Sequence, residues 1–442
     1  MRKILIAFTL VCLSAFCYAQ DGSENGLGKY IELSVDRPDG QYSSGEIVNV
    51  YARVDSLAYE TVNMTVSVNG IRRQMQPLSL KEGDQLIFSG SYSGSTAVMV
   101  SLSDPDSPRR RLDIGFVVDP MGFRPGYNEP RDLRKYWRDQ FKALKKEKMQ
   151  VKMTPVALDA ADAGEYECWD VEISCPGGAP VRGYLARPKN AAKASLPAVL
   201  QSCAAGVAGS WCRATVKETV SMAKWGNGAM AFFINAHGMY NDRDEQYYKD
   251  LENGPLKDYS VRKVTTRDEY YFRAMFLRME RAVEFLCSDK LWDGKRLMVV
   301  GESQGGAQAA AIAGLDPRVS AAVLKVPAMI DMGGYKAGRA SGWPQPGERE
   351  LDNPTVDEVI PYFDAALLMK GCEAKMFVEI GLIDTTCPAS AVLAGVNNTA
   401  GNVIVSTFPR RPHHEPSDPK IKKVWRKNVY EERMNFINGY LK

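Results

Sequence analysis

The sequence predicts an α/β protein in which a mostly parallel β-sheet, with helices on both faces, follows a small antiparallel β-sandwich. Two patterns indicate this architecture. Between residues 28 and 119, short segments of alternating apolar and polar residues are separated by turn sequences, as in antiparallel strands with one buried face. From residue 132 onward, continuous apolar runs alternate with helical segments, as in parallel strands that are buried on both faces.

Length and composition fit a globular protein of two or more domains. The chain has 442 residues, of which 45% are hydrophobic and 25% charged, so it can bury a full core. Two of its 56 basic residues lie in the first three positions, and the remainder nearly balance the 53 acidic residues. This balance argues against a nucleic-acid partner.

The first twenty residues, MRKILIAFTLVCLSAFCYAQ, have the form of a secretory signal. Arg2 and Lys3 precede an uncharged run, and small residues follow, so we expect cleavage after Ala19 and export to the periplasm or the outside of the cell. A lipid anchor at Cys17 is the alternative, which the bulky Phe16 before it disfavours. The run is too short to span a bilayer and no later segment approaches twenty apolar residues, so no transmembrane segment is predicted.

Cysteines do not organise the fold. Cleavage after Ala19 would leave an odd number of them at irregular spacings, which is not typical of a disulfide framework, although one or two disulfides stay open. These cysteines are Cys168, Cys175, Cys203, Cys212, Cys287, Cys372 and Cys387. The chain has neither an H-E-x-x-H motif nor a glycine-rich nucleotide fingerprint, so we predict no metal site and no cofactor.

Each predicted element can be read from its segment. The expected strands of the sandwich are 30–35, 48–54, 62–68, 86–90, 97–102 and 112–118. This region has no histidine and its carboxylates are scattered through turns, so we interpret it as an accessory module. An amphipathic helix is expected from Asp132, with its apolar side at Leu133, Tyr136, Trp137, Phe141 and Leu144.

The second part is expected to alternate strands and helices. Its predicted strands are 168–174, 181–188, 196–202, 229–236, 296–301, 321–328, 375–381 and 402–408. Long helices are expected over 270–286 and directly after Ser303.

Gly301-Glu302-Ser303-Gln304-Gly305 matches the G-x-S-x-G pattern between a predicted strand and a predicted helix, which is the setting of a nucleophile elbow. A sharp turn of this kind leaves no room for side chains at the flanking positions, which explains the glycines. It also presents the serine at a helix N-terminus, where developing negative charge is favoured. The alternative is an ordinary tight turn with Ser303 as the helix N-cap.

A serine nucleophile needs a histidine to accept its proton and a carboxylate to orient that histidine. The chain has only three histidines. His237 precedes the elbow, whereas His413 and His414 follow it, and the order serine, acid, histidine of elbow hydrolases favours the late pair. Either of the two could lie in a loop above the elbow.

The acid should follow a strand between Ser303 and the histidines. Asp384 comes shortly after the strand 375–381, at the strand edge where functional groups of open α/β sheets gather. Asp364 is the rival, but it precedes a helical segment and is more simply explained as an N-cap.

Several segments together resemble the acetyl xylan esterase and cephalosporin C deacetylase family of α/β hydrolases over residues 122–442. They are DGKRLMVVGESQGG, AGLDPRVSAAVLKVPA, PYFDAA, GLIDTTCPAS and the His414-Glu415 pair. The resemblance extends to a secreted branch with a preceding β-sandwich. It implies three parts: a signal peptide at 1–19, an immunoglobulin-like sandwich at 28–119 and a catalytic α/β-hydrolase domain at 122–442.

The resemblance implies that Ser303 is the nucleophile, Asp384 the orienting acid and His414 the base, because the histidine of the family directly precedes a glutamate. It implies an oxyanion hole made by the backbone amides of Gln304 and Ala205. Relatives carry an aromatic-His-Gly turn where this chain reads Ser202-Cys203-Ala204-Ala205-Gly206, which puts the rate or the acyl preference in doubt. His237 stands where many relatives have an arginine, and we interpret it as structural.

The activity that the resemblance implies is the removal of acetyl groups from acetylated xylan or related poly- and oligosaccharides through an acyl-enzyme, without a cofactor. Family members often assemble, so a homo-oligomer is an open expectation. Two alternatives are kept. The first is a serine peptidase of the prolyl oligopeptidase type, although 90 residues of sandwich cannot form the propeller of those enzymes. The second is an idle relative that binds acylated glycans, which the altered loop at Cys203 keeps open.

Overall fold

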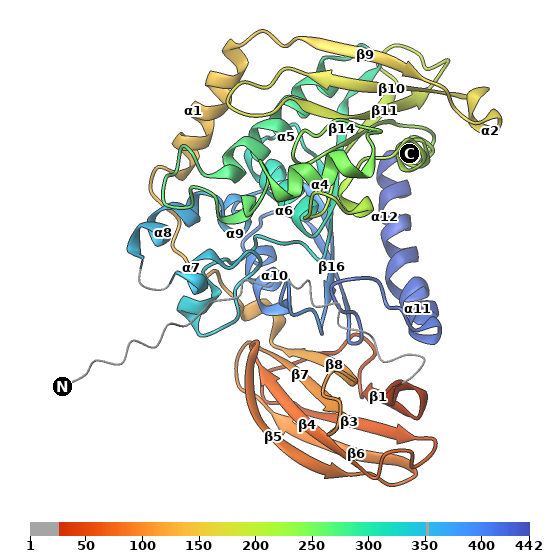
Figure 1. Cartoon of the computed structure of the whole chain (residues 1–442), viewed down its shortest axis with the longest axis vertical. Helices are drawn as coiled ribbons and strands as arrows, with labels where there is room; N and C mark the ends of the chain where they lie inside the picture. The colour runs from red at the N-terminus through yellow and green to blue at the C-terminus, as the bar shows by residue number, and fades with distance from the viewer. Residues whose placement is uncertain (1–25, 351–352) are drawn as a thin grey trace.

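The computed structural model describes residues 26–350 and 353–442, so the predicted signal peptide at 1–19 lies outside the described residues. Figure 1 shows two layered parts. An N-terminal pair of small sheets lies at one end of the molecule, and a large sheet flanked by helices makes up the rest.

The N-terminal strands form two sheets that share one apolar core. One sheet has the order β1-β3-β6 and the other the order β2-β8-β7-β4-β5, and all their pairings are antiparallel except that of β2 with β8. The strands are β1 (Ile31–Val35), β2 (Gln41–Tyr42), β3 (Ile47–Val54), β4 (Thr61–Val68), β5 (Ile71–Ser79), β6 (Gly83–Ser91), β7 (Thr96–Ser103) and β8 (Arg111–Val118). Alternating burial along β3 shows how the polar–apolar alternation of the sequence places one face of each strand in the core.

Two of these strands were not expected from the sequence. The strand β2 is only two residues long, and β5 carries IRRQMQPLS, whose residues do not alternate between apolar and polar. The strand β5 lies at a sheet edge and pairs only with β4, so its formation depends on the neighbouring strand rather than on its own burial.

The large sheet has nine strands in the order β17-β16-β15-β14-β12-β13-β11-β10-β9. The six strands β17, β16, β15, β14, β12 and β13 pair in parallel, and β11, β10 and β9 at the other side are antiparallel. The expected mostly parallel sheet is therefore present. The strands are β9 (Val151–Val156), β10 (Tyr166–Ile173), β11 (Val181–Pro188), β12 (Leu196–Ser202), β13 (Met230–Ile234), β14 (Trp292–Glu302), β15 (Ala321–Lys325), β16 (Lys375–Gly381) and β17 (Val403–Phe408). The central strands β12, β13, β15 and β16 are almost entirely buried, which explains their continuous apolar sequences.

Helices cover the large sheet on both sides (Figure 1). In this view α5 and α6 lie on one side of β14 and β16, and α12 lies on the other. The helices are α1 (Leu133–Lys146), α2 (Ala160–Ala163), α3 (Val216–Ala223), α4 (Glu245–Asn253), α5 (Tyr271–Ser288), α6 (Gln304–Leu315), α7 (Pro346–Arg349), α8 (Pro354–Val359), α9 (Ala365–Leu368), α10 (Ala389–Val396), α11 (Pro419–Trp425) and α12 (Glu431–Leu441). All five apolar residues predicted for the inner side of α1 are buried. Within the described residues, no helix combines the length and the apolarity that a bilayer span requires.

The carboxyl ends of β12, β14, β16 and β17 lie at one edge of the sheet, because these strands are parallel and near one another. The loops after them contain Ala205, Ser303, Asp384 and the histidine pair at 413–414. The parallel topology therefore brings together residues that are more than 200 positions apart in the sequence.

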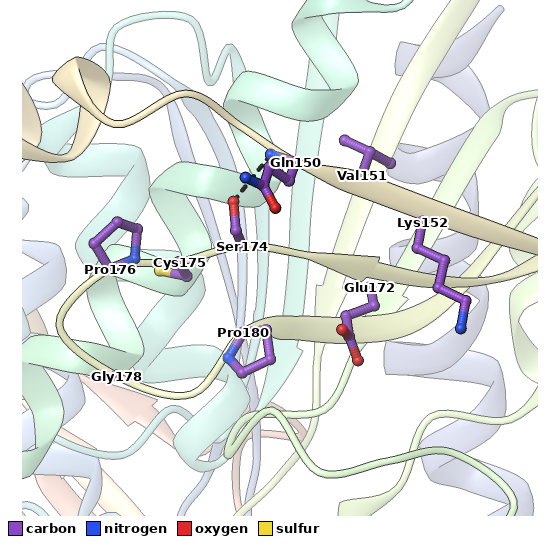
Figure 2. Close-up of a pocket in the computed structure, with 9 residues that line it drawn as sticks. All are labelled: Gln150, Val151, Lys152, Glu172, Ser174, Cys175, Pro176, Gly178 and Pro180. Atoms are coloured by element: carbon purple, nitrogen blue, oxygen red, sulfur yellow. Dashed lines mark hydrogen bonds between the residues drawn. The ribbon is translucent and has the colours of Figure 1, made fainter.

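A separate hollow of about 580 Å³ lies beside β9 and β10, at the end of the strand order away from β17 (Figure 2). Its walls include Val151, Lys152 and Glu172, and the backbone amide of Gln150 donates to the Ser174 hydroxyl at 2.9 Å. None of the predicted site residues lines this hollow.

Candidate active site

Ser303 lies in the sharp turn between β14 and α6, with φ 53° and ψ −120°. A positive φ is unusual for a residue with a side chain and stores backbone strain. The neighbouring positions 301 and 305 have room only for glycine. A Cβ on Gly301 would lie 2.1 Å from the Gly305 carbonyl oxygen, and a Cβ on Gly305 would lie 2.3 Å from that of Ser202. The elbow therefore fits only if these positions carry no side chain.

The Ser303 side chain does not cap α6, although the residue occupies the N-cap position. Its Oγ lies 2.9 Å from Nε2 of His413 instead. The alternative of a simple N-cap serine is therefore not what the structure shows.

His413 lies between Ser303 and Asp384. Its Nδ1 is 2.8 Å from the Oδ2 atom of Asp384, while its Nε2 faces the serine. The choice of His414 from the sequence is corrected on this point, because His413 is the histidine in contact with both predicted partners. The ring of His414 lies beside that of His413, with the centroids 5.4 Å apart and the planes at 70°.

A buried ion pair lies two residues before His413. Arg411 is buried and pairs with the buried carboxylate of Glu379 in β16 at 2.7 Å. This ion pair ties the loop after β17 to the neighbouring strand. The motif alone does not indicate which histidine turns toward the elbow, because both histidines stand in the same short loop.

Asp384 is held by its own loop. Its Oδ1 atom accepts hydrogen bonds from the backbone amides of Thr386 and Cys387, both at 2.8 Å, which leaves Oδ2 for the histidine. The rival Asp364 caps α9 and also accepts the backbone amides of Asp331 and Met332. Burial, followed by the nearby charge of Asp331, raises the pKa of Asp364 to about 8. It is a structural carboxyl, as its N-cap interpretation predicts.

The contacts determine the tautomer of His413. A carboxylate only accepts hydrogen bonds, so Nδ1 carries the hydrogen, and in the neutral ring Nε2 has a lone pair that can accept the serine hydroxyl. Burial opposes the charged imidazole, but the charge of Asp384 outweighs it and raises the pKa of His413 well above its usual range. This orientation is the one that nucleophilic catalysis by serine needs.

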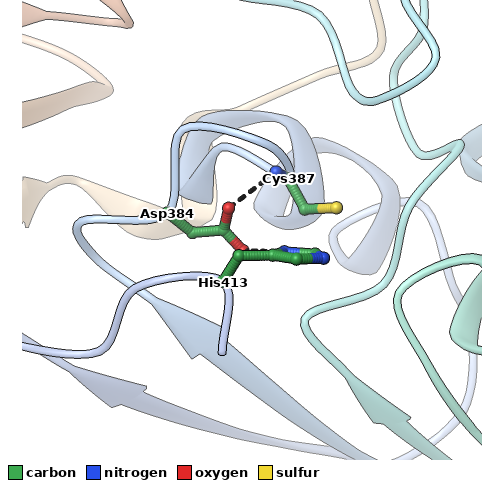
Figure 3. Close-up of side chains that lie close together, drawn as sticks. All are labelled: Asp384, Cys387 and His413. Atoms are coloured by element: carbon green, nitrogen blue, oxygen red, sulfur yellow. Dashed lines mark hydrogen bonds and ion pairs between the residues drawn. The ribbon is translucent and has the colours of Figure 1, made fainter. Parts of the chain in front are cut away.

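Cys387 lies close to the same two side chains (Figure 3). One donor atom from each of Asp384, Cys387 and His413 falls within 4.8 Å of the others. The imidazole and the carboxylate are already bonded to each other, and burial raises the pKa of the thiol to about 11. We therefore explain the cluster by the histidine–aspartate contact and not as a metal centre. All seven cysteines of the described residues are unpaired thiols.

The loop after β12 packs against the elbow and carries Ala205. Beyond it, the amide of Gly206 donates to the hydroxyl of Tyr259 at 3.3 Å, and this hydroxyl donates to Oε1 of Gln304 at 2.7 Å. The predicted oxyanion-hole residues Gln304 and Ala205 thus belong to segments that one tyrosine hydroxyl connects. The indole of Trp211 donates to the Ala205 carbonyl at 3.0 Å, on the other side of the same loop.

His237 contacts this loop at Gly206. Its Nε2 lies 3.0 Å from the Gly206 carbonyl, which can only accept, so Nε2 carries the hydrogen and Nδ1 accepts from the hydroxyl of Tyr271 at 2.9 Å. Burial, with the charge of Arg278, lowers the pKa of His237 to about 3 and keeps it neutral. His237 is therefore structural, as expected, but the part played by Tyr259 and Tyr271 was missed. No spacing in the sequence connects these tyrosines to the elbow.

A buried ion network lies under the site. Both oxygens of Glu379 are used: Oε1 by Arg411 and the indole of Trp425, and Oε2 by Arg433 at 2.6 Å. Glu302, next to the serine, pairs with Lys325 at 2.8 Å. Although burial opposes its charge, Lys325 and then Arg411 lower the pKa of Glu302 to about 2. The charges beside Ser303 are thus compensated within the protein.

Two family models and a named relative match this chain. Residues 120–335 match the acetyl xylan esterase family model, and residues 279–442 match that of the prolyl oligopeptidase family. Over 404 residues the chain is 28% identical to the acetyl esterase Axe7A of Xylanibacter ruminicola. The matched region covers 88% of each protein.

Two solved structures share the fold. The acetyl xylan esterase of Paenibacillus sp. R4 is 24% identical, with a TM-score of 0.59 over 73% of this chain and 98% of that one. Acetyl xylan esterase 1 of Thermoanaerobacterium sp. JW/SL YS485 is 19% identical, with a TM-score of 0.56 over 71% and 97%. These findings confirm the predicted resemblance and the α/β-hydrolase fold, and the sequence matches indicate a carboxylic-ester hydrolase.

Replacing Tyr259 by phenylalanine should uncouple the loop after β12 from the elbow. The change leaves the Gly206 amide and the Gln304 side-chain oxygen without their shared partner, and we expect a loss of about 1–3 kcal/mol in the free energy of unfolding. The turnover of p-nitrophenyl acetate should fall about tenfold as well, because small displacements of stabilising groups are costly in the transition state.

Tyr248→Phe is the matched control. Tyr248 is buried, and its hydroxyl also bonds two backbone groups, those of Tyr240 and Arg243, away from the elbow. Denaturant unfolding should show a similar loss for both variants, while steady-state kinetics should show a slower reaction only for Tyr259→Phe. Equal turnover in the two variants would contradict a link between Tyr259 and the site.

Proposed function

Starting from the relationship of the chain to the acetyl xylan esterases, we propose that it is a serine carbohydrate esterase that removes acetyl groups from acetylated xylan or related oligosaccharides. The observation that carries the proposal is the continuous contact from Ser303 to His413 at 2.9 Å and from His413 to Asp384 at 2.8 Å. It lies at the carboxyl edge of the sheet, where α/β proteins bind their ligands.

In the proposed reaction the serine attacks the ester carbonyl while His413 takes its proton at Nε2. Asp384 holds the ring in the required tautomer and stabilises the positive charge that develops on it. The negative charge on the carbonyl oxygen would be met by the amides of Gln304 and Ala205. The sugar hydroxyl leaves with the proton from His413, and water then releases acetate from the acyl-enzyme.

We further propose that residues 1–19 are a signal peptide, residues 28–119 an accessory sandwich and residues 122–442 the catalytic domain, and that the mature protein is exported. The substrate is an acetylated poly- or oligosaccharide, no cofactor takes part, and assembly into a homo-oligomer stays open.

A peptidase is the second candidate, because residues 279–442 also match the prolyl oligopeptidase family. The match covers the part of the chain with Ser303, Asp384 and His413, which are equally suited to amide and ester substrates. The N-terminal strands form two small sheets of three and five strands and not the propeller of the prolyl oligopeptidase type, which disfavours the peptidase. A substrate panel separates the two candidates: acetate released from acetylated xylo-oligosaccharides favours the esterase, and cleavage of proline-containing peptides favours the peptidase.

Ser303→Ala should abolish acetate release from p-nitrophenyl acetate and from acetylated xylo-oligosaccharides. Loss of the nucleophile should lower kcat by at least about 10³-fold, since loss of one member disables the triad as a unit. Acetate release is measured directly, and a melting temperature close to that of the unchanged protein shows that folding is intact. Wild-type turnover in Ser303→Ala would remove the serine from the mechanism. No release by the unchanged protein would favour an idle glycan binder.

His413→Ala and His414→Ala should differ strongly. The first removes the proton acceptor of Ser303 and should lower kcat by at least about 10³-fold, whereas the second should lower it less than about tenfold. Because the two variants differ by one position in the same loop, each is the control for the other. The reverse ranking in steady-state kinetics would return the role of base to His414.

The reaction should slow as the pH falls. A protonated His413 cannot accept the serine proton, and Asp384 raises the pKa of His413, so the acid limb of kcat/KM should lie above the ordinary histidine range near about 6.5. In Asp384→Asn the residual activity should show this limb at lower pH, because the neutral amide no longer favours the charged ring. An unchanged limb in that variant would separate Asp384 from the titration.

A further inference from the structure

The N-terminal sheets contact the loops that carry the acid and the base. The amide of Gly115, in β8, donates to the carbonyl of Pro409 at 2.9 Å. Pro409 directly follows β17 and stands four residues before His413. This hydrogen bond therefore joins the sandwich to the start of the histidine loop.

The same glycine lies against the loop of Asp384. A Cβ on Gly115 would lie 2.1 Å from the carbonyl oxygen of Leu382, which leaves no space for a side chain. Gly40 approaches the same residue from the next segment of the sandwich, with its own Cβ position 2.7 Å from Cδ1 of Leu382 and 3.0 Å from Pro409. Leu382 is buried and stands two residues before Asp384.

A third contact reaches the end of β17. The hydroxyl of Thr407 donates to the Asp39 carbonyl at 2.6 Å and accepts from the side-chain amide of Gln41 at 3.1 Å. Thr407 is itself almost fully buried. Both of these hydrogen bonds join the Thr407 hydroxyl to the sandwich.

The two loops behave as one unit because they are bonded to each other. The amide of Leu382 donates to the Phe408 carbonyl at 3.1 Å, and that of Ile383 donates to the Arg411 carbonyl at 3.3 Å. A displacement at Leu382 or Pro409 would therefore be passed to both Asp384 and His413.

We infer that the N-terminal sandwich is a positioning element of the active site, which holds the loops of Asp384 and His413 at their distance from Ser303 through Gly40, Gly115 and the Thr407 contacts. The inference rests on the proposed function of Ser303, His413 and Asp384. It assigns the sandwich a part in the reaction beyond that of an accessory module. A misplacement of catalytic groups by about 1 Å can lower a rate about 10²-fold, so a small shift of this interface should be measurable.

Gly115→Ala in the full-length protein tests the inference. The added methyl group must displace Leu382, and we expect kcat for p-nitrophenyl acetate to fall about tenfold or more while KM changes less than about threefold. Gly90→Ala is the matched control, since its Cβ would crowd Phe88 at 2.8 Å inside the sandwich and not the loops. Its kcat should stay within about twofold of the unchanged protein.

Thr407→Val is a milder test that keeps the shape of the side chain and removes both hydrogen bonds to the sandwich. We expect kcat to fall about three- to tenfold. Thr96→Val is its control, because the Thr96 hydroxyl is also buried but bonds the Gly94 carbonyl within the sandwich at 3.2 Å. That variant should keep its kcat.

The pH dependence separates positioning from mere stability. If Asp384 moves away from His413, the acid limb of kcat/KM should shift to lower pH in Gly115→Ala, and the limb of Gly90→Ala should not move. Lower melting temperatures with unchanged kcat and an unchanged limb in both Gly115→Ala and Thr407→Val would overturn the inference. That outcome would leave the proposed function standing, because the proposed function is tested separately by Ser303→Ala in the otherwise unchanged protein.

Discussion

The strained backbone of Ser303 is held from three sides, and the rest of the site is arranged around it. Its amide donates to the Lys325 carbonyl at 3.0 Å, and its own carbonyl accepts from the amides of Ala307 and Ala328. These bonds come from β15, from α6 and from the segment after β15, so the positive φ is fixed by the surrounding fold and not by local preference. The close approach of Gly305 to Ser202 then brings the loop after β12 next to the serine.

Charge is the second constraint on the site. Glu379 is fully buried in β16 and its charge would be costly there without partners, yet Arg411, Arg433 and Trp425 satisfy both of its oxygens. Arg411 leads directly into the histidine loop. The ion network around Glu379 therefore supports the histidine loop, although Glu379 and its three partners are not members of the proposed triad.

The sandwich adds a constraint from outside the α/β part. Its contacts reach Leu382, Thr407 and Pro409, which flank the proposed acid and base, while the elbow itself is held by the large sheet and α6. Ser303 and its two partners in the proposed triad are thus supported by different parts of the molecule. Such an arrangement makes the relative position of the parts important for the proposed reaction, because the hydrogen bonds from Ser303 to His413 and from His413 to Asp384 extend between them.

The sequence by itself predicted the fold class, the elbow turn at Ser303, Asp384 as the candidate acid and most strands of both parts, because these predictions follow from local periodicity, turn residues and motif spacing. The residues alone left His413 and His414 as alternatives and the resemblance favoured His414, whereas the structure places His413 between Ser303 and Asp384. The sequence also contains no sign of the link through Tyr259 or of the contact between Gly115 and Leu382. These features join residues far apart in the chain, and the direction of each side chain depends on packing that exists only after the sheets have come together.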